Sequence, residues 1–288
     1  MKINIIRATC PYGSAAKKIE MKTKEKDLKE IVKSKYNLIA DKSNKTPCCC
    51  KKGDSAAWDK DYTIFSDSYK QLEGYAESAD LGLGCGLPTE FAQIVKGDTV
   101  LDLGSGAGND CFVARALVGE SGKVIGIDFA DKMLEKAREN ARALGYQNVE
   151  FYKGDIEKLP IAEKEVDVVI SNCVLNLVPD KQKAFAEIFR VLKTGGHFSV
   201  SDIVITGTLP DKLLKEAEMY AGCVAGAIPK ADYLGLIQQQ GFKDVVVQKE
   251  KEIHIPDDIL AKYLNRDELQ SYKNSEIGIF SITVFAAK

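Results

Sequence analysis

From residue 98 onward, short apolar runs alternate with amphipathic stretches, and this alternation constrains the fold more than any other feature. Five apolar runs have the length of buried strands: residues 98–104, 123–128, 149–155, 166–172 and 197–204. Three stretches between them have helical spacing: residues 109–119, 130–145 and 181–193. Asp131 and Gly145 mark the start and end of the second helix, and Gly195 and Gly196 close the third. The alternation predicts an α/β fold, a doubly wound, mostly parallel sheet with helices on both faces.

The two ends of the chain extend this pattern. After the fifth strand we expect a helical stretch near 210–226, a helix at 233–241 and two closing strands at 244–253 and 280–288. Before the alternation, residues 24–40 have the spacing of an amphipathic helix, and a polar loop with Cys48, Cys49 and Cys50 follows. Residues 1–60 carry 15 Lys and Arg against 7 Asp and Glu. We therefore divide the chain into an extension, 1–60, and a domain, 61–288, with a substrate-binding insertion near 204–232.

Composition excludes several classes of protein. The chain has 288 residues, 45% of them hydrophobic, and a net charge of -2, which argues against disorder and against general nucleic-acid binding. No apolar run reaches the roughly 18 residues of a membrane helix, so we expect a cytoplasmic protein with reduced thiols and no membrane partner. The eight cysteines form no CxxC pair and only two histidines are present, which disfavours a structural zinc site.

A glycine loop and three aspartates mark a ligand site at the strand ends. Asp102, Gly104 and Gly106 lie where the first strand meets the first helix, and the spacing is G-x-G-x-G, unlike that of dinucleotide sites. Asp128 ends the next strand, where a carboxylate can accept both ribose hydroxyls, and Asp155 ends the third, placed for an exocyclic amine. Because these groups lie at the carboxyl edge of the sheet, they predict a nucleoside ligand. NAD(P), the competing ligand, is disfavoured by the glycine spacing.

This stretch resembles the class I S-adenosylmethionine methyltransferases in VLDLGSGAG, IGIDFADKML, KGDIEKLP and VDVVISNCVLNLVPD. The resemblance implies a Rossmann-like fold with an antiparallel closing strand and S-adenosyl-L-methionine as the cofactor. It also implies a role for individual residues. Gly104 and Gly106 would face the methionine, Asp128 the ribose, Met133 the adenine, Asp155 the adenine amine and Asn172 the methionine amine.

Three cysteines in separate loops are candidates for a thiol site at the same edge. Cys85 lies in the glycine-rich LGLGCGLP, Cys173 directly follows the fourth strand, and Cys223 lies in the insertion. Buried packing is the ordinary role of such a cysteine, and we expect it for Cys111. Three thiolates without a nearby histidine suit a soft, trigonal-pyramidal centre such as trivalent arsenic, whose lone pair can attack a sulfonium methyl.

The chain resembles the arsenite methyltransferases, especially the prokaryotic ones, over residues 62–245, through YAESADLGLGCGLPTE, DLGSGAGND, RVLKTGGHFSVSDIV and MYAGCVAGA. The resemblance implies that Cys85, Cys173 and Cys223 bind As(III), presented as arsenite or its thiol conjugates. A thiol reductant, thioredoxin or glutathione, would return the methylated arsenic to the trivalent state. Eukaryotic members have a tyrosine where this chain has Leu83, and they have a longer C-terminal region, which leaves the number of methyl groups added open.

Two other functions stay open, together with the role of the cysteine run. The chain could be a small-molecule methyltransferase of the quinone type, or a non-enzymatic protein that binds arsenic or metal through thiols. In related enzymes an upstream cysteine pairs with the first arsenic ligand, which gives Cys48, Cys49 and Cys50 a redox role toward Cys85. Lys51 and Lys52 favour the thiolate forms of this run. The alternative is a flexible tail with incidental metal affinity.

Overall fold

The computed structural model describes residues 29–41, 67–207, 226–254, 257, 260–261, 264–275 and 277–288. The expected helical stretch near 210–226 lies outside the described residues except for Gly226, and so do the cysteine run 48–50 and the proposed boundary at residue 60. Within the described part, no helix is long and apolar enough to cross a membrane.

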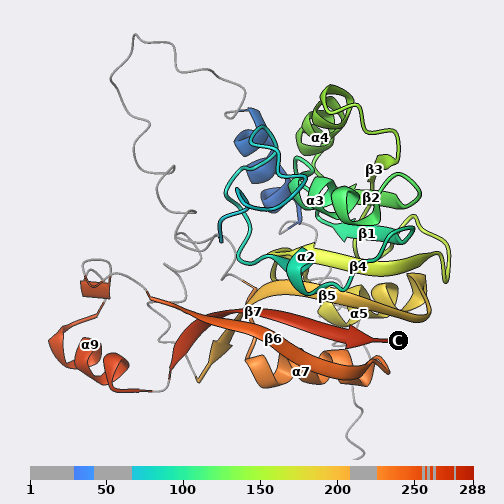
Figure 1. The fold of residues 1–288 in the computed structure, drawn as a ribbon. Coiled ribbons are helices and arrows are strands. Elements are labelled where there is room, and N and C mark those ends of the chain that lie inside the picture. Colours follow the sequence, from blue (N-terminus) through green and yellow to red (C-terminus); the bar gives the residue numbers. More distant parts are fainter. Residues whose placement is uncertain are drawn as a thin grey trace, which may run out of the picture.

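A seven-stranded sheet forms the centre of the molecule in the order β3-β2-β1-β4-β5-β7-β6 (Figure 1). The strands are β1 (Thr99–Leu103), β2 (Lys123–Asp128), β3 (Val149–Lys153), β4 (Val166–Asn172), β5 (Leu192–Thr206), β6 (Lys243–Ile253) and β7 (Gly278–Ala287). Strands β1 to β5 pair in parallel, and β7 runs antiparallel to both β5 and β6. The predicted α/β fold is confirmed, and its antiparallel strand, β7, lies between β5 and β6.

Helices cover both faces of the sheet. The described elements are α2 (Pro88–Phe91), α3 (Asn109–Val118), α4 (Asp131–Ala143), the 3₁₀ helix η1 (Leu175–Leu177), α5 (Lys181–Val191), α7 (Lys230–Gln239) and α9 (Arg266–Lys273). On β1, Val100 packs with side chains of α3 and α4, while Leu101 and Leu103 pack with side chains of α5 and α7 on the other face. Because neighbouring residues of β1 face opposite covered sides of the sheet, Val100 and Leu101 are both apolar and buried.

The structure differs from the expected boundaries at β5 and α7. Gly195 and Gly196 do not close α5; the helix ends at Val191, and β5 starts at Leu192 and runs through both glycines. Pairing explains the longer strand, because β4 and β7 flank β5 and the backbone N–H of Lys288 donates to the carbonyl of Gly196. The helix expected at 233–241 begins three residues earlier, at Lys230.

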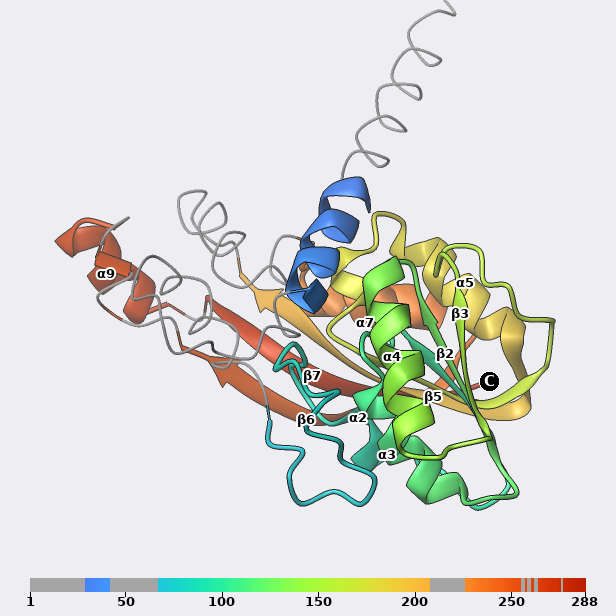
Figure 2. The same cartoon turned by 90° about the horizontal axis from the view of Figure 1, so that it is seen from above.

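The helix of residues 29–41 packs on the domain as one more element at the carboxyl end of the sheet. In Figures 1 and 2 this blue helix lies beside α4. Ala40 is buried with Ala130 and Met133, and Asn37 Oδ1 accepts the backbone N–H of Lys132 at 3.0 Å. The described part of the extension is therefore continuous with the core of the domain.

Candidate active site

A cavity of about 440 Å³ opens at the carboxyl ends of β1, β2, β3 and β4. Parallel pairing brings these four ends to one edge of the sheet, which is where ligands of such sheets bind. Five of the predicted cofactor residues line it: Gly104, Gly106, Asp128, Asp155 and Asn172. Cys173 lines the same cavity. The structure thus brings a predicted thiol ligand to the wall of the predicted cofactor site.

The glycine loop is held close to β2 by backbone hydrogen bonds. The N–H groups of Gly104 and Ser105 both donate to the carbonyl of Ile127, at 2.7 and 3.0 Å. Gly104 has φ 70°, and a Cβ on it would lie 2.5 Å from Val174, so only glycine fits this turn. The turn leads directly into α3, whose first residue is Asn109.

Asp128 is buried and its carboxylate is fixed by the backbone. Its two oxygens accept the N–H groups of Gly106 and Ala130, at 3.0 and 2.8 Å. Burial raises the pKa of Asp128, and these backbone donors oppose that rise. The fixed carboxylate therefore presents its remaining lone pairs to the cavity as acceptors for hydroxyl groups.

Two further carboxylates lie next to the glycine loop, Asp102, which is buried, and Asp110, which is half-buried. Burial raises the pKa of Asp110 to about 6, although Tyr69 and Asn172 donate hydrogen bonds to it. Burial and the charge of Asp110 raise the pKa of Asp102 as well, and Asp102 accepts from Cys111 Sγ at 3.1 Å. Asp110 lines the cavity and so places negative charge beside any ligand there.

Asp155 meets a side chain from the helix of residues 29–41. Its Oδ2 accepts from Lys29 Nζ at 2.7 Å, and its Oδ1 accepts the backbone N–H of Glu157 at 3.0 Å. Lys29 also binds the Glu157 carboxylate at 2.8 Å. Val32 and Tyr36, further along the helix, line the cavity with Lys29, so the helix forms one of its walls.

Cys85 and Cys173 belong to one small buried cluster, together with Ile203, Ile205, Ile253 and Ile279. Their exposed fractions are 1% and 3%. Cys173 has φ 60°, a left-handed conformation that non-glycine residues rarely adopt and that recurs at functional sites. Its backbone N–H donates to the carbonyl of Ser201 at 2.7 Å, which holds the turn after β4 against β5.

The other predicted site residues have different positions. Met133 is fully buried against the helix of residues 29–41, and neither it nor Asp102 is part of the cavity wall. Cys223 and the cysteine run 48–50 lie outside the described residues. Cys111 is fully buried in the first turn of α3, which confirms its predicted packing role.

Several polar residues of the site were missed from the sequence. Asp110 has a local signal, an acidic residue in the first turn of the helix that follows a glycine loop. Tyr69 and Lys29 have no such signal, because their partners Asp110 and Asp155 are 41 and 126 residues away. Contacts of this range follow from the packing of whole elements.

The comparisons with known proteins agree with this geometry. The family described as "Methyltransferase domain" matches residues 94–252. The chain is 42% identical over 236 residues to a protein of Halobacterium salinarum named arsenite methyltransferase, covering 78% of this chain and 60% of the relative. A protein of the same name from Aquipseudomonas alcaligenes is 34% identical over 244 residues, covering 82% of this chain and 68% of the relative.

A solved structure adds to these sequence relatives. It is the arsenic(III) S-adenosylmethionine methyltransferase of Chlamydomonas reinhardtii, with a TM-score of 0.61 and 37% identity over 71% of this chain and 67% of that one. The fold and the site at its carboxyl edge define a class I methyltransferase. The chain belongs to the methyltransferase family that contains these arsenite methyltransferases.

Proposed function

We propose that the protein is an arsenite methyltransferase that moves a methyl group from S-adenosyl-L-methionine to As(III) held by Cys85, Cys173 and Cys223. One observation carries the proposal: Cys173 lines the cavity predicted to hold the cofactor and is buried in the same cluster as Cys85. A substrate on these thiols would therefore adjoin the cofactor. The names of the relatives support arsenite as the substrate.

The residues of the cavity fit S-adenosylmethionine. Ser105 Oγ and Asn109 Oδ1 line it and are buried without a hydrogen-bond partner among the residues that the structure describes, so a polar ligand could hydrogen-bond to them. Gly104 and Gly106 would face the methionine part, Asp128 the ribose and Asp155 the adenine amine. Asp110 would stabilise the positive charge of the ligand. When bound, this cofactor supplies an electrophilic methyl group on a sulfonium.

The protein's contribution to the reaction is positioning. The three thiolates would hold As(III) with its lone pair directed at the cavity, and the buried surroundings of Cys85 and Cys173 would exclude water. Arsenic supplies its own electron pair, and the leaving group is a neutral thioether. No general base is required for this step, which accords with the scarcity of histidine, since the chain has only two.

A reduction must follow each transfer. Methylation leaves arsenic formally pentavalent, and two thiols return it to the trivalent state by giving two electrons, forming one disulfide and releasing two protons. We propose that a thiol of Cys48, Cys49 or Cys50 pairs with Cys85 in this step. Thioredoxin or glutathione would then reduce the disulfide. The triple serine variant should therefore stall after about one turnover on arsenite while binding the cofactor normally.

Methylation of arsenite tests the proposed function. Purified protein is incubated with arsenite, S-adenosylmethionine and a thiol reductant, and arsenic species are separated by chromatography. The wild type and Cys111→Ser should both form methylated arsenicals. Cys173→Gly should form none, although glycine tolerates the left-handed backbone at this position and the variant should fold. Product formation by Cys173→Gly at the wild-type rate would remove this thiol from the site.

A further inference from the structure

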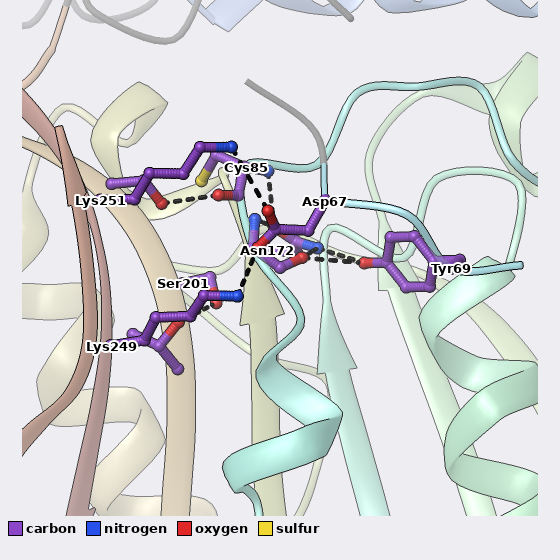
Figure 3. A network of polar contacts seen from close by, with 10 residues as sticks. Asp67, Tyr69, Cys85, Asn172, Ser201, Lys249 and Lys251 are labelled. Carbon is purple, nitrogen blue, oxygen red and sulfur yellow. Dashed lines mark hydrogen bonds and ion pairs between the residues drawn. The ribbon is translucent and has the colours of Figure 1, made fainter. Parts of the chain in front are cut away.

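The backbone of Cys85 is held by polar side chains from two separate parts of the chain, Asn172 at the end of β4 and Ser281 on β7. Figure 3 shows the network, with Cys85, Asn172, Tyr69 and Ser201 among its labelled residues. Asn172 ends β4, directly before Cys173, and its amide faces the loop that carries Cys85. This amide fixes the backbone of the loop by hydrogen bonds, whereas burial of a thiol requires only apolar contacts.

The Asn172 amide binds the loop through both of its ends. Its Oδ1 accepts the backbone N–H groups of Cys85 and Gly86, at 3.0 and 3.3 Å. Its Nδ2 donates to the carbonyl of Gly86 at 2.8 Å. One side chain thus binds two backbone N–H groups and one carbonyl of this loop.

A second pair of contacts orients the amide. Nδ2 of Asn172 also donates to the hydroxyl of Tyr69 and to the carboxylate of Asp110, the latter at 3.2 Å. The Tyr69 hydroxyl donates in turn to Asp110 at 2.9 Å and is buried. Because an amide rotated by 180° would lose these acceptors, its oxygen is directed at the N–H groups of the Cys85 loop.

Strand β7 holds the loop from the other side. Ser281 Oγ donates to the carbonyl of Cys85 at 2.6 Å. A Cβ on Gly84 would lie 2.6 Å from Asn172 Nδ2, and a Cβ on Gly86 would lie 2.6 Å from Ser201 Oγ. The two glycines beside Cys85 are therefore needed for close approach, so that the backbone can fit between β4 and β7.

We propose that Asn172, oriented by Tyr69 and Asp110 and assisted by Ser281, is the positioning residue that fixes the Cys85 thiol relative to Cys173. We call this set the Cys85 clamp; its members are Tyr69, Cys85, Asp110, Asn172 and Ser281. Because Cys173 follows Asn172 in the chain, one strand end sets the place of both thiols. The arsenic-binding part of this inference rests on the proposed function, but the clamp itself does not.

The alkylation rates of individual thiols test the clamp without arsenic. Asn172→Ala and Ser281→Ala should raise the rate at which iodoacetamide modifies Cys85, about five- to tenfold, because each removes contacts that keep the loop closed. Cys111, buried in α3, should react at the wild-type rate, as measured by mass spectrometry of its peptide. Ser171→Ala is the matched control for Ser281→Ala, since Ser171 Oγ also donates to a buried carbonyl, that of Leu103 at 3.0 Å.

Activity on two substrates then separates the clamp from the proposed function. The arsenic of methylarsonous acid already has a methyl group in one coordination position, so two thiolates suffice to hold it, whereas arsenite needs all three. Ser281→Ala should therefore lose about tenfold in kcat/KM for arsenite and keep it within twofold for methylarsonous acid. Three results would each overturn the clamp: an equal loss of kcat/KM on both substrates in Ser281→Ala, an unchanged alkylation rate of Cys85, or a parallel rise in the alkylation rate of Cys111. If the wild type converts neither substrate, the proposed function fails, and the alkylation rates still decide the clamp.

Discussion

Asp128 shows how a single strand-end residue shapes the cofactor cavity. We predict that Asp128→Ala weakens S-adenosylmethionine binding by about 1–3 kcal/mol, because it removes a buried acceptor and frees the N–H groups of Gly106 and Ala130. Calorimetry measures the affinity. Asp98→Ala is the control, since Asp98 also accepts a backbone N–H, that of Val95, but precedes β1 at the opposite edge of the sheet. Unchanged affinity in Asp128→Ala would refute the assignment of this carboxylate.

The raised pKa of the Asp202 carboxyl predicts how the stability of the folded protein depends on pH. It is fully buried, accepts from the Tyr233 hydroxyl at 3.1 Å, and burial raises its pKa to about 7 while the charge of Lys181 opposes the rise. The unfolded carboxyl titrates near 4, so between about pH 4 and 7 the folded state holds a proton that the unfolded state has released. Stability should therefore fall as pH rises through this range.

The measurement is the melting temperature between pH 5 and 8. Asp202→Asn should flatten the decline, and Asp98→Asn should leave it as in the wild type. A smaller decline remains in Asp202→Asn because burial also raises the pKa of Asp102, Asp110 and Asp128, and each of these carboxyls contributes with the same sign. A melting temperature that rises with pH in the wild type would contradict this description of Asp202.

Among the elements, the helix of residues 29–41 contributes a wall of the ligand cavity. Its Lys29 binds both Asp155 and Glu157, and its Lys33 lies 3.3 Å from the Asp131 carboxylate. These partly exposed ion pairs each contribute about 1 kcal/mol or less. Lys29→Met should loosen this wall and weaken cofactor binding about three- to fivefold, more at low salt than at high salt.

Lys132→Met is the matched control for Lys29→Met. Lys132 makes an ion pair with Glu135 at 2.8 Å on the exposed side of α4 and is not part of the cavity wall. Its removal should leave the cofactor affinity unchanged. Tighter binding in Lys29→Met would show that Lys29 competes with the ligand for Asp155.

The elements themselves follow closely from the sequence. Strands β2 and β4 have the predicted bounds, because each has a mainly apolar centre and ends in a polar residue at the sheet edge. The predicted amphipathic helix at 24–40 overlaps the observed helix, but its function as a cavity wall follows from ion pairs across more than 120 residues. The extension of β5 through Gly195 and Gly196 likewise follows from pairing with neighbouring strands, which no local pattern reports.

At the scale of the whole molecule, the fold collects residues that are distant in sequence at one edge of the sheet. The sequence predicts which residues lie at strand ends, and hence that Gly104, Asp128, Asp155 and Cys173 meet. It does not predict side-chain orientation. The amide of Asn172 faces the loop of Cys85, 87 residues earlier, because β4 and β7 flank that loop. Such orientation depends on how loops pack after the sheet has formed.

The central claim is that a methyl group moves from the cofactor cavity to arsenic on the protein's thiols. A single-turnover reaction tests it most directly, with protein in excess over S-adenosylmethionine labelled in its methyl group and arsenite present. We predict that the label co-elutes with a methylated arsenical, about one methyl for each cofactor consumed, and that Cys173→Gly yields no labelled arsenical. Label that stays on the cofactor in the wild type, or that appears on an arsenic-free product, would contradict the claim.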